Sequence, residues 1–100
     1  MQATATNYTT ESILATLGYP DAMMAARQQA RMMLLGRLTR LQSLIQQFER
    51  TWGCTLDEMR ARYEREGYEN FEADDAFLEW QWYAEAVEAI QTQLKALKTQ

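Results

Sequence analysis

Two stretches of the chain carry apolar residues at alternating three- and four-residue steps. The first series is Leu34, Leu38, Leu41, Ile45, Phe48 and Trp52. The second series is Trp80, Tyr83, Val87, Ile90, Leu94 and Leu97. A mean step of 3.5 residues is typical of a helix whose apolar seam packs against another helix. The pattern therefore predicts two long helices, at about residues 21–52 and 75–98, that pack antiparallel through these two seams.

The first twenty residues have room for one short helix. Thr9 or Thr10 can cap its start through a hydroxyl, and Gly18 followed by Pro20 can end it. We place this helix at about residues 10–17. Residues 1–8 show no apolar periodicity and are expected to form a mobile arm.

A second short helix is predicted between the two long ones, at residues 56–66. Gly53 ends the first long helix, and Gly67 ends the short one. The residues Thr55 to Glu58 match a capping box, in which the threonine and glutamate side chains each accept from the other residue's backbone N–H. The apolar face of this helix consists of Leu56, Met59 and Tyr63. Asp74 or Asp75 is expected to cap the final helix, where the helix dipole favours carboxylates.

The last helix is apolar over more than one stripe. Off its seam lie Phe77, Leu78, Trp82, Ala86 and Ala89. Two helices cannot enclose both stripes, and leaving three aromatic side chains uncovered would forgo roughly 10 kcal/mol. The first short helix, a second copy of the chain or another protein must cover the surplus. We expect one all-α domain over residues 1–100 that dimerises into a four-helix assembly.

Composition narrows the class of protein. Apolar residues make up 47% of the chain, which is too many for a disordered sequence. The single cysteine, Cys54, has no partner for an intramolecular disulfide and is expected to act as a small apolar side chain in a reducing compartment. The sequence shows neither a signal-peptide pattern nor an apolar run of membrane-spanning length. A cytoplasmic location is expected.

Charge is divided unevenly along the chain. Residues 1–50 carry five basic and three acidic side chains, whereas residues 51–100 carry five basic and eleven acidic ones. Net acidity disfavours binding to phosphate backbones and suits a basic partner. The basic residues of the first long helix are Arg27, Arg31, Arg37 and Arg40. Their spacing spreads them around the helix and does not resemble a recognition helix, so nucleic acid is not an expected partner.

The sequence offers little for catalysis. It has no histidine, and its four glycines form no phosphate-binding loop. Glu85 and Glu88 share a helix face, as in helical nucleotide pyrophosphatases, but the ten residues from 91 to 100 hold no second acidic pair. We therefore expect no enzymatic activity, no cofactor and no metal. A carboxylate-dependent metal hydrolase that also uses Asp74, Asp75 and Glu79 remains the third hypothesis.

Residues 48–90 resemble the antitoxins of small bacterial and archaeal toxin–antitoxin modules. The positions that carry the resemblance are Phe48, Glu49, Gly53, Leu56, Gly67, Asp74, Asp75, Phe77, Leu78, Glu79, Trp80 and Tyr83. The most distinctive part is DDAFLEWQWY, and the matching segment covers under half of the chain. The resemblance implies a cytoplasmic inhibitor that binds a partner toxin, often a nuclease with a basic cleft.

These observations lead to a non-enzymatic, antitoxin-like protein-binding module as the first hypothesis. The side chains expected to bind the partner are Asp74, Asp75, Phe77, Leu78, Glu79 and Trp82. Trp80 is expected in the core, and Trp82 is expected either to anchor the partner or to form a dimer contact. The alternative hypothesis is a self-associating structural protein without a toxin, in which the same aromatic residues are buried between identical chains.

Overall fold

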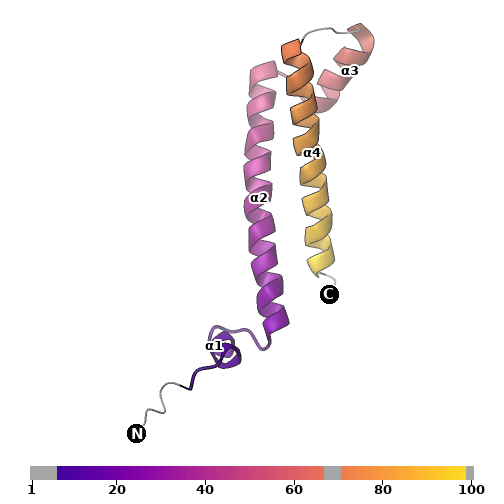
Figure 1. Ribbon diagram of the computed structural model, residues 1–100. Helices are drawn as coiled ribbons and strands as arrows, with labels where there is room; N and C mark the ends of the chain where they lie inside the picture. Colours follow the sequence, from indigo (N-terminus) through magenta and orange to yellow (C-terminus); the bar gives the residue numbers. More distant parts are fainter. Residues whose placement is uncertain (1–6, 67–70, 99–100) are drawn as a thin grey trace. The chain divides into compact units, whose positions relative to one another are not determined.

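The computed structural model describes residues 7–66 and 71–98, which form four helices (Figure 1). They are α1 (Thr10–Thr16), α2 (Ala22–Trp52), α3 (Leu56–Glu66) and α4 (Phe71–Lys98). The residues so described contain no strand, which confirms the all-α prediction. The expected turn at Gly67 and most of the expected arm at residues 1–8 lie outside the described residues. The chain divides into two compact units, one of residues up to Met33 and the other of residues from Leu34 onward, so the boundary falls within the sequence of α2.

In the first unit, α1 is fixed at both ends by local hydrogen bonds. Of the two threonines considered, Thr9 is the N-cap: its hydroxyl accepts from the Ser12 N–H at 3.0 Å, and the Ser12 hydroxyl oxygen accepts from the Thr9 N–H at 2.9 Å. At the other end Gly18 has a φ of 97°, and its N–H donates to the Ala15 carbonyl at 3.0 Å. The Tyr19 N–H donates to the Leu14 carbonyl at 2.8 Å, which completes a Schellman motif.

The predicted helix at residues 21–52 is confirmed as α2. The Asp21 carboxylate accepts from the Met24 N–H at 2.8 Å and so caps the first turn. The helix continues through Gly36 and ends at Trp52. Gly53 follows with a φ of 66°, and its N–H donates to the Glu49 carbonyl at 2.8 Å. A left-handed residue here reverses the chain direction at little steric cost only because it is glycine.

The start predicted for the last helix is wrong by four residues. α4 begins at Phe71, so Asp74 and Asp75 are the fourth and fifth residues of the helix and neither is its N-cap. The sequence from 71 to 74 contains no helix breaker, and acidic residues in the first turns of a helix are favoured by its dipole. The side chain of Asp74 instead accepts a hydrogen bond from the Tyr63 hydroxyl of α3.

In the second unit, α4 lies antiparallel beside α2 from Leu34 onward (Figure 1). Phe48 of α2 stacks on Trp80 of α4, with ring centroids 5.6 Å apart and planes inclined by 10°. The twelve seam residues given above are all partly or fully buried. The antiparallel helical hairpin expected from the two matching seams is therefore the fold of this unit.

α3 closes the end of the hairpin where α2 ends and α4 begins. The buried centre of the core consists of Cys54, Met59 and Trp80. The partly buried side chains around it are Ile45, Phe48, Trp52, Leu56, Tyr63 and Phe77. Trp80 is 1% exposed, which confirms its predicted core position. Cys54 is a free and buried thiol in this cluster, in keeping with a small apolar side chain.

Replacement by alanine should change the free energy of unfolding in opposite directions at Gly36, inside α2, and at Gly53, just after its end. A Cβ added at Gly36 meets no atom within 4 Å, so Gly36→Ala should raise the free energy of unfolding by about 0.5 to 1 kcal/mol. Gly53 has a positive φ, so Gly53→Ala should lower it by about 1 to 2 kcal/mol. Urea unfolding of both variants at one protein concentration tests this, and shifts of the same sign would contradict it.

Candidate functional site

Two large apolar side chains of α4 are exposed on one face of the helix. Leu78 is 64% exposed and Trp82 is 62% exposed. Residues four apart lie on the same side of a helix, one turn from each other. Trp80 lies between them in sequence but is buried, because two residues correspond to just over half a turn. α4 therefore places one tryptophan in the core and presents another to solvent.

A hollow of about 390 Å³ lies between α2 and α4 next to Trp82. Its apolar walls are Leu41, Trp82, Ala86, Ala89 and Ile90. Two cationic side chains, Arg37 and Arg40, complete the lining from α2. The guanidinium groups and the exposed indole thus border the same apolar hollow.

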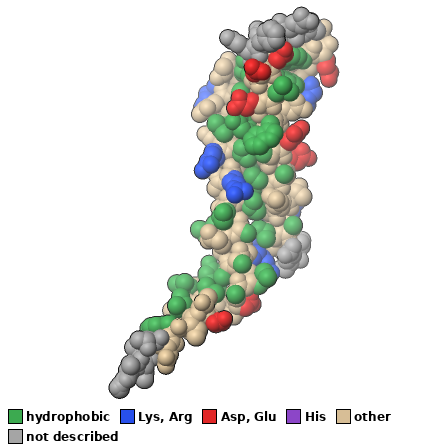
Figure 2. All heavy atoms as spheres, in the orientation of Figure 1, with side chains coloured by type: hydrophobic (Ala, Val, Ile, Leu, Met, Phe, Trp, Pro, Cys, Tyr) green, Lys and Arg blue, Asp and Glu red, His purple; other side chains and the backbone are tan. Residues whose placement is uncertain are grey.

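A second hollow of about 370 Å³ continues along the same two helices. It is lined by Leu44, Gln47, Phe48, Thr51, Trp52, Ala76, Glu79 and Tyr83. The α2 residues that line the two hollows recur at three- and four-residue steps, so they share one helix face. The two hollows are therefore consecutive parts of one groove, which we call the interhelical groove. In Figure 2, hydrophobic side chains gather along the line between α2 and α4, with basic groups over α2 and acidic groups at the outer edge of α4.

Aromatic and carboxylate contacts hold the side chains beside Trp82. The Tyr83 hydroxyl donates to a Glu79 carboxylate oxygen at 2.8 Å. This hydrogen bond raises the pKa of Tyr83, because the phenolate form could not donate. The indole of Trp82 meets the Tyr83 ring edge-on, with centroids 5.4 Å apart. Glu79, Tyr83 and Trp82 thus form a connected row beside the groove.

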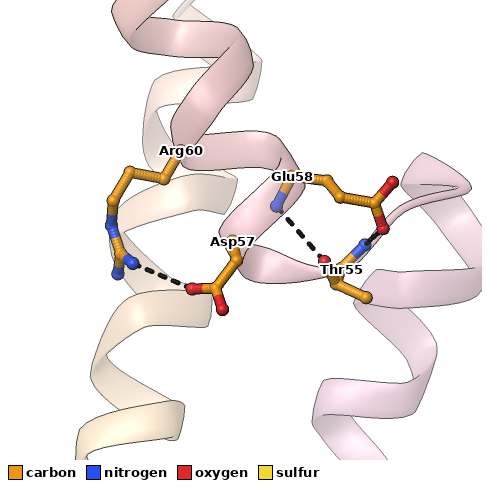
Figure 3. Close-up of polar contacts among 4 residues, drawn as sticks. All are labelled: Thr55, Asp57, Glu58 and Arg60. Atoms are coloured by element: carbon orange, nitrogen blue, oxygen red, sulfur yellow. Dashed lines mark hydrogen bonds and ion pairs between the residues drawn. The ribbon is translucent and has the colours of Figure 1, made fainter.

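Local polar contacts fix the first turn of α3. Its start is the predicted capping box: the Thr55 hydroxyl accepts from the Glu58 N–H at 3.2 Å, and Glu58 Oε1 accepts from the Thr55 N–H at 3.1 Å (Figure 3). The bond from the Thr55 backbone lowers the pKa of Glu58, and the Thr55 side chain adds to the effect. Arg60 Nη1 and Asp57 Oδ1 form an exposed ion pair at 3.0 Å, one turn apart (Figure 3).

The six residues expected to bind a partner fall into two groups. Asp75, Leu78, Glu79 and Trp82 are exposed. Phe77 is instead partly buried, with its ring centroid 4.9 Å from that of Tyr63, and Asp74 is the partly buried carboxylate that accepts from the Tyr63 hydroxyl. Both belong to the contact between α3 and α4. The candidate site is thereby reduced to the four exposed residues of α4 and the adjoining groove.

The two arginines of the groove were not expected at the site. Their irregular spacing with Arg27 and Arg31 suggested a scatter around the helix. The signal that could have found them is local: Arg37 and Arg40 are four and one residues before the seam residue Leu41. Side chains at those offsets lie at the border of an apolar stripe.

The described part of the chain holds no cluster of three or more metal-ligating side chains and no membrane-spanning helix. No three acidic, cysteine or histidine side chains of the described residues are grouped so that they could hold a metal ion. Glu85 and Glu88 are both exposed on α4. Within residues 7–66 and 71–98, no helix combines the length and apolarity needed to cross a membrane.

Comparison with known proteins adds no relative to this picture. The chain matches no protein-family model, no curated protein and no solved structure.

Proposed function

We propose that this chain is a helical protein-binding module that acts by occupying a partner and not by catalysis. The observation that carries the proposal is the exposed pair Leu78 and Trp82 on one face of α4. A contiguous exposed apolar patch, unlike a single exposed leucine, marks an interaction surface, and tryptophan is among the commonest energetic anchors of interfaces. The helical hairpin and α3 form the scaffold that fixes these anchors.

The acidic groups beside the anchors indicate the chemistry of the partner. Asp75 and Glu79 are exposed on the same helix as Leu78 and Trp82. Carboxylates around an apolar centre steer a basic surface toward the site and disfavour acidic partners. Together with the resemblance of residues 48–90 to antitoxins, this supports an antitoxin-like inhibitor that covers the basic cleft of a toxin in the cytoplasm.

Coexpression with the product of the neighbouring gene tests this function. The two proteins should purify as one complex, and titration calorimetry should show about tenfold weaker binding for Leu78→Ala, because a central apolar anchor is lost. Asp75→Lys should weaken binding mainly at low salt, since it reverses a screened surface charge. Leu35→Ala is the matched control, because Leu35 is an exposed leucine on α2.

Two outcomes would count against the proposal. If the neighbouring product does not bind, the antitoxin-like function is wrong. If it binds and neither Leu78→Ala nor Asp75→Lys changes the affinity, the partner uses another surface and the α4 site is wrong.

A further inference from the structure

We infer that the interhelical groove is the docking surface for a second copy of this chain, with Arg40 of each copy against Glu85 of the other. The two copies would form a four-helix bundle around a two-fold axis that runs parallel to the helices. This inference concerns self-association. Trp82 would be covered in the dimer, so a second copy and a toxin would compete for this side chain and a toxin would bind the monomer.

Opposite charges lie on the two edges of the groove. Arg40 lines the hollow from α2, together with Trp82 and Ala86 of α4. Glu85 lies between these two α4 residues in sequence, so it is at the same level along the helix pair. It is two residues from the seam positions Tyr83 and Val87, which is about 200° around the helix and hence directed away from α2.

Neither charge is neutralised by a contact within the described part of the chain. Arg40 and Glu85 are both exposed. Among the described residues, the ion pair between Arg60 and Asp57 involves neither of them. The α2 edge of the groove is therefore positive and the α4 edge negative at the same level, with apolar side chains between them.

The positions of the two charges favour one of two possible symmetry axes. A two-fold axis parallel to the helices brings the α2 edge of one copy against the α4 edge of the other at the same level, so the contact of Arg40 with Glu85 is made twice. An axis across the helices would bring α2 against α2 and oppose arginine to arginine. The parallel axis also keeps each helix direction, so α2 lies antiparallel to α4 of the second copy, as in antiparallel four-helix bundles.

The apolar centre of the groove fits the same axis. The parallel axis carries Trp82 of the second copy toward the α2 side of the hollow, beside Leu41 and Arg37. An indole is the best aromatic partner for a guanidinium group in a cation–π contact. Ala86 and Ala89 are small, which allows the two pairs of helices to approach closely. Trp82 of each copy would thus be covered by the groove of the other copy.

Charge reversal tests this arrangement by sedimentation equilibrium. The unmodified chain should dimerise, and Arg40→Glu and Glu85→Arg should each weaken the dimer about tenfold or more, because two attractive contacts become repulsive. The double variant Arg40→Glu with Glu85→Arg should recover the original dissociation constant within about threefold. An equimolar mixture of the two single variants should also recover it, since all contacts between unlike chains are then complementary.

Glu88→Arg is the matched control, because it makes the same charge change one turn further along α4 and away from the groove. Far-UV circular dichroism should show unchanged helix content for all variants, since the three positions are exposed. A monomer at every concentration would overturn the inference, as would single reversals without effect or a double variant as weak as the single ones. Failure of the dimer would leave the toxin-binding test with Leu78→Ala and Asp75→Lys in force, and failure of that test would leave the dimer in place, so the two proposals fail separately.

Discussion

Replacing Trp80 by alanine is expected to lower the free energy of unfolding by about 3 to 5 kcal/mol. The Trp80 side chain is 1% exposed, stacks on Phe48 and joins the buried Cys54 and Met59. Its removal leaves a cavity at the point where α2, α3 and α4 meet. A domain of this size has a total stability of about 5 to 15 kcal/mol, so the variant should be close to unfolding at room temperature.

The control for this change is the second tryptophan of the same helix. Trp82→Ala removes an equal side chain that is 62% exposed and should cost less than about 1 kcal/mol. Urea unfolding followed by circular dichroism, at a protein concentration low enough to keep the chain monomeric, gives both values. A larger loss from Trp82 than from Trp80 would show that the core is not where the structure places it.

The helices and the core could be predicted from sequence because their signals are local. The alternating steps of three and four residues fixed the two seams, and the pair Phe48 and Trp80 meets as those seams require. The capping box of Thr55 and Glu58 depends on side chains three residues apart. Gly53 ends α2 through its own backbone conformation.

The start of α4 could not be predicted in the same way. The sequence of residues 71 to 74 is compatible with a polar connection and with a first helical turn. A contact with a residue distant in sequence decides between the two. Asp74 accepts a hydrogen bond from Tyr63, eleven residues earlier, and Phe77 packs on the same ring. Both were expected to bind a partner because the chain alone does not show that α3 covers this side of α4.

The candidate site was predicted in part for a related reason. The four-residue step from Leu78 to Trp82 placed both off the seam, and both are exposed. Which side chains line the groove depends on how α2 and α4 are rotated about their axes relative to each other. Only the structure of the packed helix pair shows this rotation. Arg37 and Arg40 therefore become part of the site only when α2 and α4 are seen together.

Replacing Met59 by alanine is expected to cost about 2 to 5 kcal/mol and to destabilise the whole second unit. Met59 is a buried residue of α3, 2% exposed, and it forms one cluster with Cys54 and Trp80. Because that cluster joins α3 to α4, a cavity at Met59 weakens the packing of both helices. Met59→Leu keeps the volume and should cost less than about 1.5 kcal/mol.

Native-state hydrogen exchange measures how this loss is distributed over the helices. If α3 folds together with the hairpin, Met59→Ala should reduce the protection of slowly exchanging amides in α3 and α4 by similar factors. Tyr63→Phe removes the hydroxyl that donates to Asp74 and should reduce protection less, by about 0.5 to 1.5 kcal/mol. Faster exchange of α3 in Met59→Ala, with α4 unchanged, would mean that α3 opens independently and that the hairpin core is stable without it.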